Sequence, residues 1–99
     1  MKYYEVYIEE LQQSKLERQR LWKFLVELPE GAHGESKAMA VAKEAGGTEL
    51  RNDFKNATIQ AKLVPINVAK LDSAKSIMKD ECRVWILQKA SGFEANPFL

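Results

Sequence analysis

The residues most capable of chemistry in this 99-residue chain are its only histidine, His33, and its only cysteine, Cys82. A nucleophilic enzyme needs a thiol held beside a base, and these two residues are far apart in the sequence. His33 stands between Ala32 and Gly34 in an expected exposed loop, whereas Cys82 has the character of a small buried residue at the start of a strand. We therefore expect no Cys–His dyad and no enzymatic activity.

Other catalytic and ligand-binding patterns are also missing from the sequence. A zinc site commonly draws its four ligands from several Cys or His residues at close spacing, and the chain has one of each. The carboxylates Glu5, Glu9, Glu10, Asp80 and Glu81 favour a solvated face, since catalytic pairs need burial or mutual crowding. The glycines match neither a phosphate loop nor a dinucleotide fingerprint. We expect no metal, no cofactor and no catalytic residue.

Length and composition predict one small domain. The chain is 45% hydrophobic, which suffices for a single core, and few Gly, Pro and Cys residues exclude a collagen-like chain, a disulfide scaffold and a disordered tail. Fifteen Lys and Arg against 14 Asp and Glu give a net charge of +1, which argues against an acidic nucleic-acid mimic or a generally basic coat. We assign residues 1–90 to a single domain and 91–99 to a C-terminal tail.

The N-terminal region, the longest uncharged stretch and the cysteine content together predict a cytoplasmic protein. Charged residues from Glu5 onward interrupt the N-terminal region before an apolar run develops, so no secretory signal is expected. The longest stretch without charge, Leu63–Ala69, is far shorter than the ~20 residues of a spanning helix, which argues against a membrane protein. A lone thiol, Cys82, suits a reducing compartment.

Two strands are expected near the N-terminus. Apolar and polar residues alternate over Tyr3–Ile8, as in a half-buried strand. Leu21–Leu28 carries an apolar face of alternating residues and ends at Pro29. A helix is the alternative there, because Ser14 and Glu17 form a potential capping box. The aromatic and β-branched residues favour the strand.

The remaining segments alternate between helix and strand. Glu35–Ala45 has a face of small apolar residues and is predicted as a helix that stops at Gly46-Gly47. Thr58–Val64 predicts a strand, Asn67–Glu81 a second helix, and Arg83–Lys89 a strand covered on both faces.

This element order defines the expected fold class. The order is strand, strand, helix, strand, helix, strand, with Thr48–Asn56 as a polar connector. Strand-helix-strand passages favour crossovers, and the first two strands can form a hairpin. We predict an α+β fold with a four-stranded mixed sheet covered by two helices; the strand order stays open.

Two surfaces suggest protein binding. The outward row Tyr3, Glu5, Tyr7 and Glu9 combines broad tyrosine contacts with carboxylates that select a basic partner, although an ordinary solvent-facing strand has the same appearance. As a potential edge, this strand could also add to a partner's sheet or to a second copy. The tail is the second surface: Phe98 and Leu99 could insert into a groove of a partner, or fold back onto the domain.

A basic cluster suggests nucleic acid as an alternative partner. Lys15, Arg18, Arg20 and Lys23 occupy the expected loop between the first two strands, where they could follow a phosphate backbone while a neighbouring aromatic ring stacks on bases. A solvated charged turn explains the same residues.

The absence of a catalytic constellation, the balanced charge and the aromatic residues together favour one function class. We expect a non-enzymatic, protein-binding regulator, inhibitor or adaptor, by analogy with small phage or mobile-element inhibitors of host machinery. The alternatives are a nucleic-acid-binding module and a structural subunit that self-assembles into a homo-oligomer.

Overall fold

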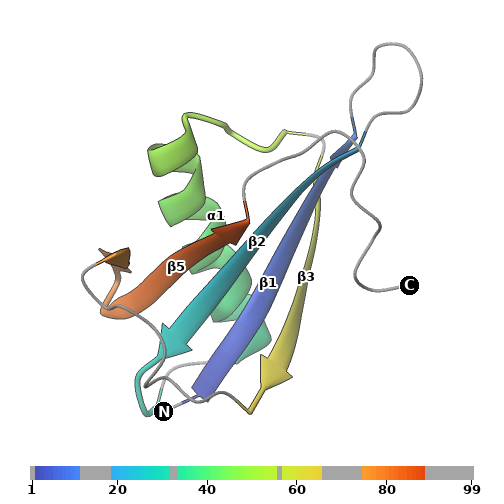
Figure 1. The fold of residues 1–99 in the computed structure, drawn as a ribbon. Coiled ribbons are helices and arrows are strands. Elements are labelled where there is room, and N and C mark those ends of the chain that lie inside the picture. The colour runs from blue at the N-terminus through green and yellow to red at the C-terminus, as the bar shows by residue number, and fades with distance from the viewer. Residues whose placement is uncertain (1, 12–18, 32–33, 56, 66–74, 89–99) are drawn as a thin grey trace.

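The fold is an antiparallel sheet with a helix packed on one face (Figure 1). The computed structural model describes residues 2–11, 19–31, 34–55, 57–65 and 75–88. Within these residues the sheet has five strands in the order β3-β1-β2-β5-β4. The elements are β1 (Lys2–Leu11), β2 (Gln19–Leu28), α1 (Glu35–Leu50), β3 (Ala57–Val64), β4 (Ile77–Lys79) and β5 (Cys82–Gln88).

This architecture confirms the α+β class and corrects its details. The predicted mixed sheet is wrong, because all four strand pairings are antiparallel. Four strands become five, and the two predicted helices become one among the described residues. The prediction of a C-terminal tail falls on residues 91–99, which lie outside the described residues.

The long β1–β2 hairpin forms the middle of the sheet. Its register runs from Lys2 opposite Leu28 to Leu11 opposite Gln19, so the strand prediction for this region is confirmed and its helical alternative is wrong over the described residues. Ser14 and Glu17, which supported that alternative, lie outside them. Because β1 lies between β2 and β3, the expectation that the first strand is an edge is also wrong.

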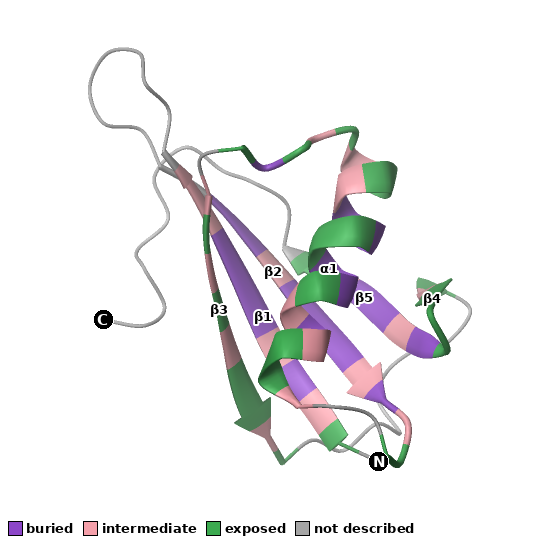
Figure 2. Ribbon diagram, turned by 180° about the vertical axis from the view of Figure 1, so that it is seen from behind, coloured by how far each residue is buried: buried purple, intermediate pink, exposed green. Residues whose placement is uncertain are grey.

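One hydrophobic core lies between the sheet and α1. Figure 2, seen from the helix side, shows buried segments of the strands behind the helix. Small side chains on the inner side of the helix let it lie close to the sheet. The buried residues of this core are Tyr4, Val6, Ile8, Trp22, Phe24, Val26, Leu28, Ala38, Val41, Ala42, Ala45, Phe54, Cys82 and Val84.

The helix does not stop at its two glycines, contrary to prediction. It continues to Leu50, and Gly46 is a buried interior residue. A β-carbon at Gly46 would lie 2.7 Å from Cζ of Phe24, so a glycine is needed where α1 lies against this ring of β2. The helix ends instead at Arg51, whose φ of 53° is left-handed, and the Asn52 amide donates to the Gly47 carbonyl at 3.1 Å.

The connector after α1 is anchored by one aromatic residue. Phe54 is 2% exposed, and its ring meets that of Trp22 edge-on, with centroids 5.8 Å apart. Its amide donates to Oδ1 of Asn52 at 2.9 Å, and its φ is 50°. Burial of the ring holds this left-handed conformation, which a non-glycine residue rarely adopts.

A hairpin replaces the C-terminal part of the second predicted helix. The prediction for Asn67–Glu81 is wrong over its described residues, 75–81, which include β4. Lys79 pairs with Cys82 across a two-residue turn, in which Asp80 and Glu81 have φ values of 50° and 65°. Positive φ at both central residues is the geometry of a tight β-hairpin, and it ends any continuation of a helix.

In the part of the chain that the structure describes, no helix is both long enough and apolar enough to cross a membrane.

We expect Gly46→Ala to destabilise the fold by about 1–3 kcal/mol, because its methyl group would overlap the Phe24 ring. This loss opposes the gain of about 1 kcal/mol that alanine brings to an exposed helix interior. Denaturant unfolding measures the change. As a control, Ala40→Gly at an exposed helical position reports helix propensity alone. A Gly46→Ala variant more stable than the parent would contradict the close packing.

Candidate protein interface

The face of the sheet that points away from α1, here called the outer face, holds the row of tyrosines and glutamates. Side chains alternate along each strand, so the neighbours of core residues in sequence point to this face. The described outer-face residues include Tyr3, Glu5, Tyr7 and Glu9 from β1; Leu21, Lys23, Leu25 and Glu27 from β2; Thr58, Gln60, Lys62 and Val64 from β3; Met78 from β4; and Arg83 and Trp85 from β5.

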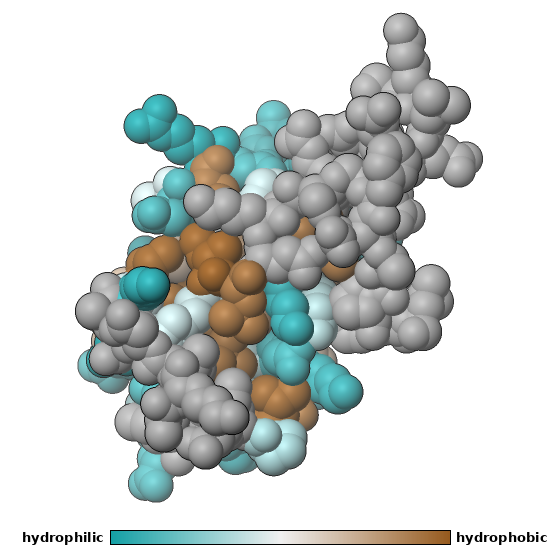
Figure 3. All heavy atoms as spheres, viewed as in Figure 1, coloured by the Kyte–Doolittle hydropathy of each residue, from teal (hydrophilic) through white to brown (hydrophobic). Residues whose placement is uncertain are grey.

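The centre of the outer face is apolar and buried, which the sequence analysis anticipated for β5, the strand expected to be covered on both faces, but not for β1 and β2. Leu25 is fully buried, and Trp85, its direct neighbour on β5, is 5% exposed. Leu21 and Tyr7 are buried as well. Figure 3 views this side of the molecule and shows hydrophobic residues in a band between hydrophilic groups. The predicted tyrosine row is therefore part of a second packed layer.

Glu5 is already engaged within the chain. Its carboxylate accepts a hydrogen bond from the Tyr7 hydroxyl and lies 3.5 Å from Nζ of Lys23. The same ammonium group lies 5.6 Å from the centre of the Tyr7 ring. These contacts tie β1 to β2 across the outer face, and they reduce the charge that Glu5 offers to a basic partner.

Glu27 organises a second polar group. It accepts a hydrogen bond of 2.7 Å from the Tyr3 hydroxyl, and its other carboxylate oxygen lies 3.9 Å from Nε of Arg83. Arg83 also donates to Oγ of Ser76 at 2.8 Å. The group extends across β1, β2 and β5, so it fixes the side chains around the apolar centre.

Both tyrosine hydroxyls resist ionisation. Burial raises the pKa of Tyr3 to about 12, helped by its hydrogen bond to Glu27 and opposed by the charge of Arg83. Burial likewise raises the pKa of Tyr7 to about 12, helped by its bond to Glu5. A neutral hydroxyl donates to each carboxylate, and a phenolate could not.

The structure brings the predicted protein-binding residues together only in part. Tyr3, Glu5, Tyr7 and Glu9 share the outer face, as expected from their alternation. Phe98 and Leu99 lie outside the described residues. The outer face also gains Met78, which is 56% exposed beside Arg83, because β4 is a strand.

The structure places two members of the predicted basic cluster in β2 and not in the loop. Lys23 lies within β2, four residues beyond its start, and pairs with Glu5. Arg20 belongs to β2 by its backbone, and its side chain, like Lys15 and Arg18, falls outside the described part. No shared basic surface links Lys23 with Lys79, which points toward α1 and pairs with Glu44.

Cys82 is placed as a structural residue, as the sequence suggested. It is fully buried, and its thiol donates to the Asp80 carbonyl at 3.4 Å. Burial raises the pKa of the thiol, although Lys37 acts in the opposite direction. His33 lies outside the described residues, so the structure does not test the dyad.

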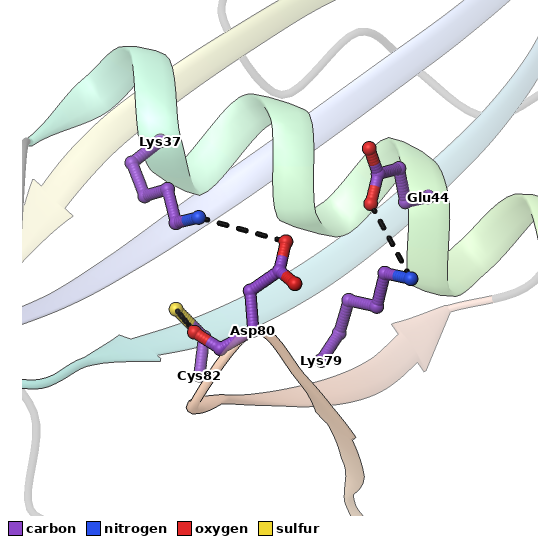
Figure 4. Close-up of polar contacts among 5 residues, drawn as sticks. All are labelled: Lys37, Glu44, Lys79, Asp80 and Cys82. Atoms are coloured by element: carbon purple, nitrogen blue, oxygen red, sulfur yellow. Dashed lines mark hydrogen bonds and ion pairs between the residues drawn. The ribbon is translucent and has the colours of Figure 1, made fainter.

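Two ion pairs attach α1 to the β4–β5 hairpin around Cys82. Figure 4 shows Lys37 directed at Asp80 and Glu44 directed at Lys79, each pair 3.6 Å apart. These side chains are partly exposed, so each pair contributes at most about 1 kcal/mol. The four charged side chains of these two ion pairs therefore stabilise the packing of α1 on the β4–β5 hairpin.

An open depression of about 870 Å³ lies at the C-terminal end of α1. Its charged lining residues include Lys43, Glu44, Arg51, Asp53 and Lys79. Lys79 is paired with Glu44, and Asp53 is paired with Lys55 at 3.6 Å. The described residues contain no group of three potential metal ligands. The depression thus offers a mixed polar surface and no convergent catalytic set.

Comparison of the chain with protein-family models, curated proteins and solved structures found no match.

We predict that the hydroxyls of Tyr3 and Tyr7 ionise only near pH 12 in an ultraviolet titration. The pKa of tyrosine in the unfolded chain is about 10. The unfolded state therefore loses these protons first, so their stabilising contribution is complete below about pH 10 and is lost as the pH rises through 12. Tyr3→Phe and Tyr7→Phe should each remove one late transition. Ionisation of both residues near pH 10 in the folded protein would contradict these part-buried hydrogen bonds.

Proposed function

We propose that the chain is a non-enzymatic protein-binding domain that contacts its partner through the outer face. The observation that carries this proposal is Met78, which is 56% exposed beside Arg83 on that face, where the surrounding charges are already paired within the chain. Preorganised side chains of this kind lose little conformational freedom on binding, and Met and Arg are enriched in protein interfaces.

The charge balance of the outer face favours a protein over nucleic acid. Its described acidic residues, Glu5, Glu9 and Glu27, are matched by Lys23, Lys62 and Arg83. A surface that follows phosphates needs an excess of cations, because affinity comes largely from counterion release. Nucleic-acid binding through Lys15, Arg18, Arg20 and Lys23 stays a prediction, as does the role of Phe98 and Leu99.

The protein class that fits this surface is a regulator, inhibitor or adaptor. Such a protein acts by occupying a surface of its partner, and it needs no convergent reactive groups. Its partner should present an apolar contact for Met78 and a mixture of both charges for the paired groups around it. Phage and mobile-element inhibitors of host machinery remain the analogy for this class.

The test is capture by the tagged full chain from extracts of its source cells, with and without nuclease. We expect a stoichiometric protein partner that resists nuclease and that Met78→Asp weakens about tenfold or more, as an interface anchor does. Ala40→Asp is the control, because Ala40 is an exposed residue of α1, on the opposite side of the sheet. Capture that depends on nucleic acid, or that Met78→Asp leaves unchanged, would overturn the proposal.

A further inference from the structure

We infer that the exposed edge of β3 pairs with β3 of a second copy of this chain, joining two sheets into one antiparallel sheet. This inference does not depend on the proposed function, which concerns the outer face and a different protein. It rests on the edge position of β3, on a groove beside it, and on the self-complementarity of its sequence.

β3 is a long strand at the end of the sheet. It extends over Ala57–Val64 and pairs with β1 on one side, and the described residues provide no strand on its other side. An edge strand of this length presents a row of backbone donors and acceptors for another strand. The opposite edge, β4, has only the residues Ile77–Lys79 and offers a much shorter template.

An open groove of about 510 Å³ lies between β3 and α1. Its apolar lining residues are Met39, Ile59 and Ala61, and its polar lining residues are Glu35, Gln60 and Lys62. Leu63 points to the same side of the sheet, because it pairs with the core residue Tyr4, yet it is 54% exposed. The edge thus carries both an exposed apolar side chain and a groove suited to receive one.

The sequence of β3 selects one pairing register. A two-fold axis between antiparallel edge strands keeps both helices on the same side of the joined sheet, so residues of the same face must lie opposite each other. With Ala61 on the axis, Leu63 of the second copy lies opposite Ile59 and beside the groove. Gln60 then faces Lys62 of the second copy on the outer face, where an amide and an ammonium group can form a hydrogen bond.

The neighbouring registers are poorer. A shift that places Gln60 on the axis opposes Ile59 to Ala61 and Leu63 to Ala57, which gives smaller apolar contacts. A shift in the other direction places Lys62 opposite its own copy, and like charges directly opposite each other destabilise a sheet. In the favoured register Pro65 lies opposite Ala57 of the second copy, at the end of the paired segment, so its lack of an amide hydrogen costs at most one terminal ladder bond.

The homodimer should be weak, with a dissociation constant of about 100 μM, because one strand and one groove bury less than a standard interface. Sedimentation equilibrium of the full chain over a concentration series measures it. Gln60→Glu should tighten the dimer and Gln60→Lys should weaken it, each by about three- to tenfold, since each change acts twice across the axis on Lys62. Leu63→Asp should abolish association, and Met78→Asp should not affect it.

The two charged variants, Gln60→Glu and Gln60→Lys, also test the pairing register. If Gln60 lay on the axis, both charged variants would weaken the dimer, which would contradict the proposed pairing. Ala40→Glu and Ala40→Lys, at an exposed position of α1, control for a general effect of charge. A parent chain that stays monomeric at millimolar concentration, or a dimer unaffected by Leu63→Asp, would overturn the inference. Thermal unfolding confirms that each variant retains the fold.

Discussion

The structure depends on the burial of β2 on both of its faces. On the helix side Phe24, Val26 and Leu28 form the middle of the core, and on the outer side Leu25 is equally buried. An antiparallel sheet can leave one face in water, but here the centre of the second face is also buried. Beside this apolar centre, the hydroxyls of Tyr3 and Tyr7 donate hydrogen bonds to carboxylates of β2 and β1.

This second layer connects stability with the proposed function. Glu5 and Glu27 bind neighbouring hydroxyl and cationic groups, so they hold the strands together and also set the surface that a partner meets. A face of paired charges around apolar side chains suits a protein surface of mixed polarity. The β3 edge is chemically different, because its exposed feature is an aliphatic side chain beside a groove. Two distinct contacts can therefore coexist on one small domain.

The sequence predicted those elements whose signal is local. Alternation located β1, β2 and β3, an unbroken apolar run located β5, and the small residues between Ala38 and Ala45 located α1. It missed the helix extension, because Gly46 resembles a stop signal until the Phe24 ring above it is known. It missed β4 as well, because Asp80 and Glu81 are not the residues that usually mark a positive-φ turn.

The site was predicted less completely than the fold. The alternation of Tyr3, Glu5, Tyr7 and Glu9 correctly placed them on one face. Their partners on β2 and β5 follow from strand order and register, which a single sequence does not specify. One available signal was overlooked: Leu21 and Leu25 interrupt the polar side of β2, which indicates a strand covered on both faces.

Comparison of Leu25→Ala with Leu28→Ala tests the two-sided burial of β2 most directly, because both leucines lie on one strand but face opposite sides. Denaturant unfolding should show losses of about 2–4 kcal/mol for both variants, the cost of removing a buried leucine side chain. A loss below about 1 kcal/mol for Leu25→Ala, beside a full loss for Leu28→Ala, would show that the outer face is not a packed layer.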